Sequence, residues 1–381
     1  MDACGNPFPL MKPSKKLKFR ILEQAARVAR LRRYQMRLDE LSKSPGMRTA
    51  AGSIGRRVRH FNGWVDRAVR EAGIAGGYDH AETVGEYYEL SNGFMVWSWG
   101  ESLHFVPLTP HESLEESKIR HQRAMIAKLE LEQGMTVIDV GCGVGGPMRR
   151  VVRETGARVV GININETQLA QAKKLNAEAG LDHLVDLKKC SFMDMSAIED
   201  DTFDRGYAIE STCHAQDKQR AFAEIFRVLK PGALFWGQEM CLTDRFDPND
   251  GRHRAVKQDL MRGVALHDIA TFGEVNRALE TAGFQVIEGR DWDVQEGPST
   301  PWYQPMESRH GTLGNALIRL PWGRKMIIAG LKLAELLRLF PNGSAEVVRL
   351  LDRTAEAWVA GGKTGTFTPL YCFLARKPSQ A

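Results

Sequence analysis

Four glycines and one aspartate fall within eight residues near the middle of the chain, in the stretch VIDVGCGVGGPMRR. Glycine permits positive φ and puts no Cβ in the path of a ligand. The helix expected after Gly145 and Gly146 offers free backbone N–H groups to an anionic ligand end. Asp139 is placed to meet an ammonium group, while Gly141 and Gly143 form the turn itself. The spacing therefore predicts a site for a small ligand that carries a carboxylate and an amine.

This spacing differs from the glycine pattern that holds a dinucleotide. That pattern is GxGxxG, with an acidic residue about 20 residues later on the ribose hydroxyls. Here the glycines run GxGxGG, and Asn163 stands where the next strand should deliver its acid. A pyrophosphate would fit poorly. The alternative is a glycine-rich turn without a ligand, which has a conformational cost and no packing return.

From Gly134 onward, short apolar runs alternate with helical patterns. This order predicts a parallel sheet with helices on both faces, in which the glycine turn joins the first strand to the first helix. The helix over 218–232 is expected to end at Pro231 and Gly232. The expected strands are 135–140, 157–162, 185–192, 203–210, 233–240, 284–294 and 367–377, and the expected helices include 147–154, 165–180, 218–232 and 271–283.

The composition is typical of a globular protein with a basic N-terminal arm. The 381 residues are 43% hydrophobic and 26% charged, with a formal net charge of +5. Residues 1–70 carry 17 Lys and Arg against 5 Asp and Glu, which suggests an anionic partner for the arm. Three hypotheses remain for the arm: a solvated helix or leader, attachment to an anionic membrane surface, or a transit peptide. Nucleic-acid binding is disfavoured, because the arm lacks interleaved aromatic residues.

The six cysteines form no CxxC pair and show no zinc-finger spacing. They predict reduced thiols and no metal site. No run of 18 apolar residues occurs, so no membrane-spanning helix is predicted.

The stretch from Asp139 to Gly146 resembles the first motif of class I S-adenosylmethionine-dependent methyltransferases. The stretches VGININETQLAQAKKLNAEAG, YAIESTCHA and EIFRVLKPGALFWGQE narrow this resemblance to sterol C-methyltransferases, which alkylate the sterol side chain at C-24. WGESLHF upstream, and TPWYQPM and GGKTGTFTPLYCFLARKP downstream, are similar to the same family. The resemblance covers roughly residues 80–378 and leaves the basic arm outside.

The resemblance implies an α/β, Rossmann-like class I methyltransferase fold with a seven-stranded, mostly parallel sheet. It also implies a division of the chain into three parts. These are a basic helical extension over 1–78, a methyltransferase core over 79–290, and a C-terminal sterol-site region over 291–381.

The cofactor that the resemblance implies is S-adenosyl-L-methionine, lying over the ends of the parallel strands. Asp139 and the turn would hold its methionine part, Asn163 and Asn165 its ribose hydroxyls, and the residues around Ser191 its adenine. An alternative role for Asn165 is the N-cap of the next helix. The implied cofactor-binding residues are Asp139, Gly141, Cys142, Gly143, Gly145, Asn163, Asn165, Gln168, Ser191 and Phe192.

The family's reaction sets the demands on the substrate pocket. An alkene is a weak nucleophile whose π bond attacks the sulfonium methyl and leaves a carbocation, which then undergoes a hydride shift and loses a proton. The pocket must hold the alkene at attack geometry, exclude water, and offer π faces and a base. The expected substrate-binding residues, with core packing as the alternative for each, are Phe94, Trp97, Trp99, Phe105, Trp302 and Tyr303.

Glu210 is the leading candidate for the base or the cation-facing carboxylate, because it ends a predicted buried strand. A structural carboxylate is the alternative. His104 and His214 are further catalytic candidates, and each has a core histidine as its alternative. Tyr207 is expected to contribute a π face or a hydroxyl, or to pack in the core.

Two acidic residues expected in the family are replaced here, by Val96 in the aromatic block and by Val264 in a second motif. The replacements leave the substrate open. The main prediction is methylation at the C-24 alkene of a sterol side chain in sterol biosynthesis. The alternatives are another sterol position such as the A ring, or another isoprenoid such as a linear triterpene. A small-molecule N- or O-methyltransferase and a non-catalytic lipid-binding protein are more distant alternatives.

The stretch PWGRKMIIAGLKLAELLRLFPNG predicts an amphipathic helix, with Lys332, Glu335 and Arg338 at three-residue spacing. It is either a core-facing helix or a membrane-facing element near a pocket mouth lined by Trp302 and Tyr303. Because a sterol is nearly insoluble, the enzyme must collect it from a bilayer or a carrier. We therefore expect peripheral association with the cytoplasmic face of the endoplasmic reticulum or another internal membrane. The sequence leaves a homo-oligomer open.

Overall fold

The structure is a computed structural model that describes residues 96, 99–294, 300–307, 321–337 and 343–379. All of them belong to one compact unit of the chain. The predicted extension over 1–78 lies outside the described residues, and so do Phe94, Trp97 and Arg338.

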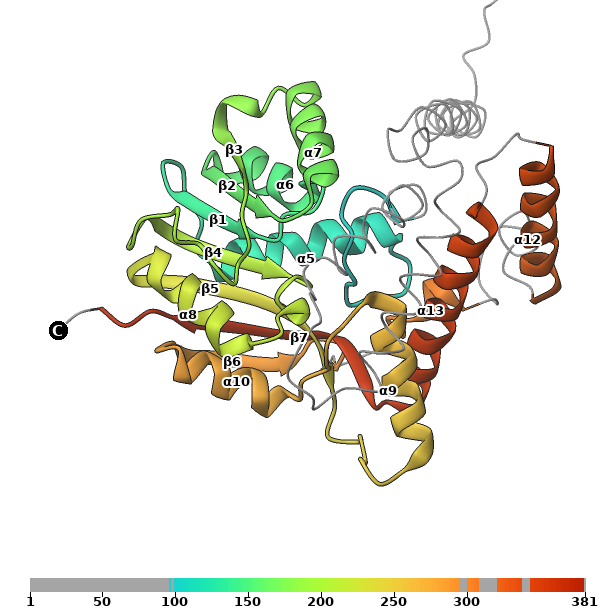
Figure 1. Ribbon diagram of the computed structural model, residues 1–381. Helices are drawn as coiled ribbons and strands as arrows, with labels where there is room; N and C mark the ends of the chain where they lie inside the picture. The colour runs from blue at the N-terminus through green and yellow to red at the C-terminus, as the bar shows by residue number, and fades with distance from the viewer. Residues whose placement is uncertain (1–95, 97–98, 295–299, 308–320, 338–342, 380–381) are drawn as a thin grey trace, which may run out of the picture. The chain divides into compact units, whose positions relative to one another are not determined.

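A seven-stranded sheet forms the centre of the described residues, with the strand order β3-β2-β1-β4-β5-β7-β6 (Figure 1). The first five strands pair in parallel, whereas β7 runs antiparallel to β5 and β6. The predicted α/β fold with a mostly parallel sheet is confirmed. The strands are β1 (Thr136–Val140), β2 (Arg158–Asn163), β3 (Val185–Lys189), β4 (Phe203–Ile209), β5 (Leu229–Leu242), β6 (Gln285–Asp291) and β7 (Phe367–Arg376).

Helices and short 3-10 turns fill the connections between these strands. The helices are α5 (Leu114–Lys128), α6 (Gly146–Thr155), α7 (Glu166–Glu178), α8 (Lys218–Val228), α9 (Gly251–Val264), α10 (Phe272–Thr281), α12 (Pro321–Leu336) and α13 (Ser344–Thr364). The 3-10 turns are η1 (Asp182–Leu184), η2 (Thr212–His214) and η3 (Gln304–Met306). Among the described helices, none has the length and apolar content needed to cross a bilayer.

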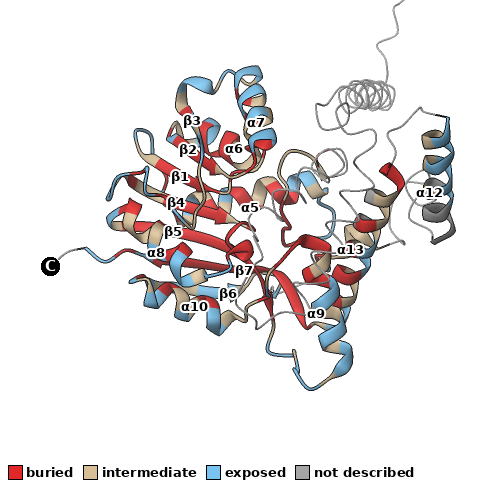
Figure 2. Cartoon of the chain, in the orientation of Figure 1, coloured by how far each residue is buried: buried red, intermediate tan, exposed pale blue. Residues whose placement is uncertain are grey.

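Both faces of the sheet are covered, as the alternating sequence pattern predicts. α8 and α10 bury Phe222 and Leu279 against one face, and α5 and α6 bury Met125 and Met148 against the other. Figure 2 shows long buried stretches along β1, β2, β5 and β7, whereas β3 and β6 at the two edges of the sheet are largely intermediate or exposed. Each fully buried side chain of this size contributes about 1.5–3 kcal/mol through the hydrophobic effect. The sheet is therefore a rigid platform for the loops at its strand ends.

The boundary between α8 and β5 differs from the predicted one. The helix ends at Val228, and the strand already begins at Leu229, so Pro231 and Gly232 lie inside β5. A residue before proline is pushed towards extended backbone, which places Lys230 in a strand conformation. Leu229 pairs with Phe203 at the start of the β4–β5 ladder. Helix α8 thus ends at Val228, before Pro231, whereas the helical pattern predicts an end at Pro231 and Gly232.

A separate apolar cluster lies at the ends of β5 and β7. It unites residues from α9, η3 and α13 with the segment before α5, and it includes Phe105, Trp302 and Trp358. Val264 of α9 is buried within it, and Val96 is also buried. Both positions where the family resemblance predicts acids are therefore buried, and the one at Val264 lies in the apolar cluster.

Candidate active site

The glycine turn follows β1 and has the backbone that the sequence predicts. Gly141, Gly143 and Gly145 have φ values of 79°, 54° and 78°. A Cβ on Gly141 would lie 2.3 Å from the Cβ of Ser211, whereas a Cβ on Gly143 would meet nothing within 4 Å. Gly141 is therefore required by the close approach of the loop after β4. Gly143 leaves open space at the strand end, where a ligand has room.

Three of the turn's amides are taken by the backbone. The N–H groups of Gly141 and Cys142 both donate to the carbonyl oxygen of Ile162, at 2.9 and 3.0 Å, and Gly145 N donates to Cys142 O at 2.9 Å. Because these three N–H groups are already used, only the other amides of the turn can donate to the carboxylate of a ligand. The sequence could not indicate this, because Ile162 reaches the turn only through the pairing of β1 with β2.

Asp139 is buried at the end of β1, as a ligand-holding carboxylate should be. Burial raises its pKa to about 7, although the Tyr207 hydroxyl, which donates to Oδ2 at 2.9 Å, lowers it. A cation close to a buried carboxylate favours the ionised form. The structure places Tyr207 beside Asp139, so its hydroxyl serves the predicted cofactor side and not the aromatic pocket.

The amides predicted to meet the ribose form a hydrogen-bonded set at the end of β2. Asn163 Nδ2 donates to Gln168 Oε1 at 2.9 Å, and Asn163 Oδ1 accepts from Asn165 N at 3.0 Å. The side chain of Asn165 accepts from Gln168 N at 2.9 Å and caps α7. The N-cap role is therefore confirmed, and ribose binding by this set stays a prediction.

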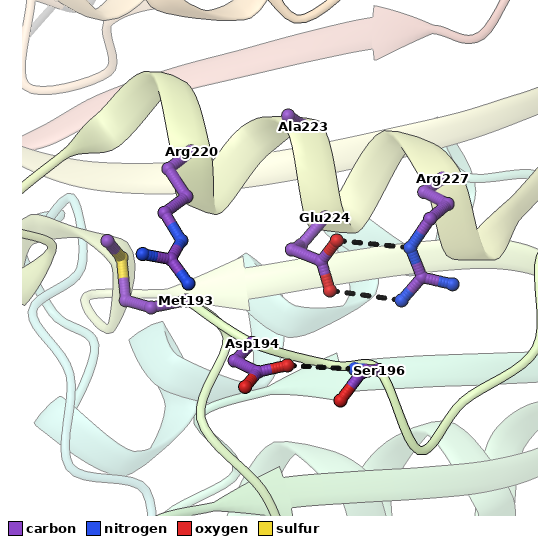
Figure 3. A pocket seen from close by; sticks show the side chains of 7 residues that line it. All are labelled: Met193, Asp194, Ser196, Arg220, Ala223, Glu224 and Arg227. Atoms are coloured by element: carbon purple, nitrogen blue, oxygen red, sulfur yellow. Dashed lines mark hydrogen bonds and ion pairs between the residues drawn. The ribbon is translucent and has the colours of Figure 1, made fainter.

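The predicted adenine residues lie in the turn after β3. Ser191 forms an isolated bridge with Asp194, its Oγ accepts from Met193 N at 3.1 Å, and Phe192 packs against the main core. A pocket opens beyond this turn, between it and α8 (Figure 3). Charged side chains dominate its lining, including the Glu224–Arg227 ion pair at 3.0 Å. Ser191 and Phe192 stay predictions for adenine binding.

The residues at these strand ends fit S-adenosylmethionine. Gly143 leaves open space, Asp139 offers a buried carboxylate for the ammonium, and the Asn163–Gln168 set offers amides at the neighbouring strand end. All of them lie at the carboxyl ends of adjacent parallel strands, where ligands of open α/β sheets bind.

A packed aromatic cluster, in which we expect the substrate pocket to open, is built around Phe105. Its ring lies 5.2 Å from Trp99, 5.3 Å from Trp302 and 4.0 Å from Trp358, measured between ring centroids. Trp302 also contacts Tyr303 at 5.6 Å. Four of the six predicted aromatic residues therefore meet in one cluster. Trp302 is only 3% exposed and is packed in the apolar cluster with Ala357 and Trp358 of α13.

Sequence reasoning missed Trp358, the ring nearest to Phe105. It lies in α13, more than 250 residues along the chain, and packs with Ala357 in the apolar cluster. A large aromatic residue within an amphipathic helix was the available signal. That signal does not say which distant residue it meets.

Glu210 lies where β4 ends, with a positive φ of 50°. Its Oε1 accepts from Phe105 N at 2.6 Å and from Gln238 Nε2 at 2.7 Å. Burial raises its pKa to about 8, against the lowering effect of these two donors and of Lys118. The carboxyl is thus largely protonated at pH 7 and is held against the backbone of the aromatic cluster. This is the environment of a proton-transfer group.

His104 is buried and neutral. Its Nδ1 must donate to the carbonyl of Phe105, at 2.9 Å, so Nε2 accepts from Gln122 Nε2, also at 2.9 Å. Burial, with His121 nearby, lowers its pKa to about 3. Both ring nitrogens are hydrogen-bonded in this structure, and a catalytic role for His104 stays a prediction.

His214 stays a prediction. It closes η2, four residues after Glu210, and its side chain is buried. Its backbone N–H donates to Ser211 O at 3.1 Å.

Buried polar residues of α5 were also missed by sequence reasoning. Lys118, His121 and Gln122 lie on the inner face of this helix. Lys118 Nζ donates to Trp99 O and lies 5.4 Å from the centroid of the Trp99 ring. Polar residues at i, i+3 and i+4 on a helix share one face, which was the available signal. Their burial depends on the strands beneath α5.

Comparisons with known proteins agree with this geometry. Residues 78–295 match the family of mycolic acid cyclopropane synthetases, and residues 318–379 match the sterol methyltransferase C-terminal region. The chain is 39% identical over 345 residues to cycloartenol-C-24-methyltransferase 1 of Oryza sativa subsp. japonica, with 89% of this chain and 99% of the relative covered. It is 35% identical over 335 residues to the sterol 24-C-methyltransferase of Saccharomyces cerevisiae, with 86% of each covered.

A solved structure shares the fold at lower identity. The geranyl diphosphate C-methyltransferase of Streptomyces coelicolor A3(2), in complex with S-adenosyl-L-homocysteine, superposes with a TM-score of 0.56. The two chains are 16% identical, with 80% of this chain and 99% of that chain covered. The sheet order and the open glycine turn define a class I S-adenosylmethionine-dependent methyltransferase. Within that class, the chain belongs to the sterol C-methyltransferase family.

Proposed function

We propose that this enzyme transfers the methyl group of S-adenosylmethionine to the C-24 alkene carbon of a sterol side chain. The observation that carries the proposal is the meeting of the two sites in the β4 loop. The side chain of Ser211 packs against Gly141 of the glycine turn. The neighbouring Glu210 accepts a hydrogen bond from Phe105 N in the aromatic cluster. A methyl donor and an apolar acceptor can thus share one reaction space.

When bound, the cofactor supplies an electrophilic methyl group on a sulfonium. The chain's own residues orient both reactants and protect the site from water. Asp139 binds the ammonium end at the end of β1, while Phe105, Trp99 and Trp358 offer π faces to a cationic side chain. Burial of these rings excludes water, which would otherwise trap the cation.

Glu210 has the environment to take the final proton. The carboxylate must be ionised to accept a proton, and its pKa of about 8 makes the ionised fraction small at pH 7. A cation beside the carboxylate stabilises the ionised form and therefore lowers the pKa of Glu210 when the cationic intermediate is present. Because kcat/KM reports groups of the free enzyme, kcat/KM should rise between about pH 7 and pH 9 if ionised Glu210 is required.

The decisive experiment is incubation of the purified protein with labelled S-adenosylmethionine and matched sterols that bear or lack a Δ24 double bond. Mass spectrometry of the product locates the methyl group. We expect label only in the Δ24 sterol, at C-24. Equal labelling of both sterols would contradict side-chain methylation. The Glu210→Gln variant should retain cofactor binding and lose most product.

A second candidate is methylation of another sterol position or another isoprenoid. Val96 and Val264 favour it, because both are buried where the family resemblance predicts acids. An acid-free wall suits a substrate without a polar group at that point. A panel that includes A-ring variants and a linear triterpene separates the two candidates by the site of the label.

We further propose that the enzyme works as a peripheral protein at the endoplasmic reticulum or another internal membrane. α12 supports this, because it packs on α13 and carries large apolar side chains in contact with solvent. Met326 is 67% exposed, Leu333 56% and Leu336 79%, and Lys332 lies exposed beside them. An amphipathic helix of this kind inserts its apolar face at a lipid interface.

Vesicle flotation tests the membrane proposal. We expect binding to vesicles with anionic lipids and loss of most binding in a Met326→Ser, Leu333→Ser, Leu336→Ser variant. Methyl transfer to a cyclodextrin-solubilised sterol should persist in that variant. Unchanged flotation of the folded variant would contradict a role for α12.

A further inference from the structure

Gln238, in the middle of β5, has an amide orientation that its surroundings fix. The side chain is 0% exposed, and its Nε2 faces three oxygen atoms. These are Glu210 Oε1 at 2.7 Å, Pro369 O at 3.0 Å and Phe105 O at 3.1 Å. Only the NH₂ end of an amide can face three acceptors. Gln238 therefore donates to Glu210 and turns its own oxygen the other way.

That oxygen meets His121 of α5. The distance from Gln238 Oε1 to His121 Nε2 is 2.7 Å, so Nε2 must carry the proton. The imidazole is neutral, because burial lowers its pKa to about 4. Its ring is 5.6 Å from Trp236 and 5.2 Å from Trp292, with edge contacts to both. The packing of the His121 ring thus fixes the position of its Nε2–H group. That donor in turn fixes the orientation of the Gln238 amide.

The amide connects the candidate base to the aromatic cluster. Phe105 N donates to Glu210 Oε1 at 2.6 Å, while Phe105 O accepts from Gln238. Both donors to Glu210 address the same oxygen, Oε1. An oxygen that accepts two hydrogen bonds is a poor place for a proton, so the proton of Glu210 resides on Oε2.

Charged and titratable groups reach Glu210 from four elements, which are α5, β5, η2 and β7. Burial raises the pKa values of the thiols of Cys213 in η2 and Cys372 in β7, and their interaction with Glu210 raises these pKa values further. Lys118 of α5 attracts the carboxylate and lowers its pKa, while Glu239 of β5 raises it. Glu239 is itself paired with Lys218 at 2.8 Å. His121 is neutral and acts only through Gln238. These charges set the ionisation of Glu210, but none of them determines which of its two oxygens receives a proton.

We propose that Gln238, held by His121, is a positioning residue that directs Oε2 of Glu210 as the proton acceptor and fixes Phe105 beside it. This rests on the proposed function, in which Glu210 takes the final proton. In that step a C–H bond next to the cationic carbon breaks. Its electron pair forms the new C=C bond, and the proton goes to Oε2 of the ionised carboxylate. The amide therefore determines which carbon of the side chain lies within reach of the base.

The first test follows the titration of Glu210 by infrared spectroscopy of its carboxyl band, without sterol. Subtraction of the Glu210→Gln spectrum identifies the band. In Gln238→Met the loss of one donor should raise the midpoint by about one pH unit. His121→Phe should raise it less, and His121→Gln, which keeps an N–H donor, should restore the wild-type value. An unchanged midpoint in folded Gln238→Met would overturn the proposal.

Tyr371→Phe is the matched control. It removes a partly buried hydrogen bond, which the Tyr371 hydroxyl donates to Asn276 Oδ1 at 2.6 Å, outside the network. It should lower thermal stability and leave the midpoint of Glu210 unchanged. A midpoint that moves equally in Tyr371→Phe would show a general structural effect and overturn the proposal.

The second test compares the alkene isomers that each variant forms from a Δ24 sterol. We expect the isomer ratio to change at least several-fold in Gln238→Met, and the His121→Phe, Gln238→Met double variant to add little. A shifted midpoint with an unchanged isomer ratio would overturn the proposal that the amide determines which carbon loses its proton. Failure of the proposed function itself would appear in the wild type, as a Δ24 sterol that gains no label at C-24.

Discussion

The two halves of the active site are built in different ways. The Asp139 side consists of one strand end, one glycine turn and one helix start, which follow each other within a few residues. The Phe105 side gathers residues from the segment before α5, from η3 and from α13, which lie far apart in the sequence. The first half depends on backbone conformation, and the second on side-chain packing. A substitution in the first half should therefore affect only the turn around it, whereas a substitution in the second half should also shift the side chains that pack against it.

The largest expected effect is on cofactor binding by Asp139. Asp139→Asn removes the buried negative charge and should weaken binding of S-adenosyl-L-homocysteine at least about 100-fold, about 3 kcal/mol. Tyr207→Phe removes only the hydroxyl that bonds to Asp139 and should cost about tenfold. Isothermal titration calorimetry measures both. Equal affinities for wild type and Asp139→Asn would show that the turn binds the cofactor without this carboxylate.

Two glycines of the same turn should separate folding from binding. In Gly141→Ala the new Cβ collides with Ser211, and we expect a loss of about 3 kcal/mol in the free energy of unfolding. In Gly143→Ala the Cβ meets no protein atom, so the stability loss should be about 1 kcal/mol and the cofactor affinity should fall about tenfold. Urea unfolding and calorimetry give the two quantities. The reverse ranking would contradict the assignment of the open space to the ligand.

The cofactor side should also respond to pH. Without ligand, Asp139 has a pKa of about 7, and only its ionised form pairs with an ammonium group. Affinity should therefore fall roughly tenfold between pH 7.5 and pH 6, as Asp139 gains a proton. Tyr207→Phe should move this transition to higher pH, because the hydroxyl lowers the pKa. Calorimetry in a series of buffers measures the profile, and a flat profile in the wild type would exclude Asp139 as its source.

The smallest effect is expected on the aromatic side. Lys118→Met removes the donor to Trp99 O and the cation over its ring, while it keeps a side chain of similar length. The KM for the sterol should rise about fivefold, and the affinity for the cofactor should not change. Lys128→Met, in a partly exposed ion pair with Glu288 at the end of the same helix, is the control. If both variants behave alike, Lys118 has no special role for Trp99.

The sequence by itself determined the alternation of strands and helices, the place of the glycine turn and the position of Asp139 beside that turn. These features depend on backbone geometry and on periodicity over a few residues, which a sequence displays directly. It also placed Glu210 at a strand end and brought Trp99, Phe105, Trp302 and Tyr303 into consideration. The predicted end of the helix at Pro231 differs from the observed one, because helical periodicity contains no information on where a strand begins to pair with its neighbour.

The tertiary structure alone decided which groups these residues meet. In the structure the amides of Gly141 and Cys142 donate to Ile162 O. Both ring nitrogens of His104 are hydrogen-bonded, and Trp358 packs against Phe105. The fold also buries His121 and Gln238 beside the candidate base. Hydrogen-bond partners and burial arise from segments that are close in space and distant along the chain. A local sequence pattern cannot predict these contacts, because the desolvation of a polar group depends on every segment that packs around it.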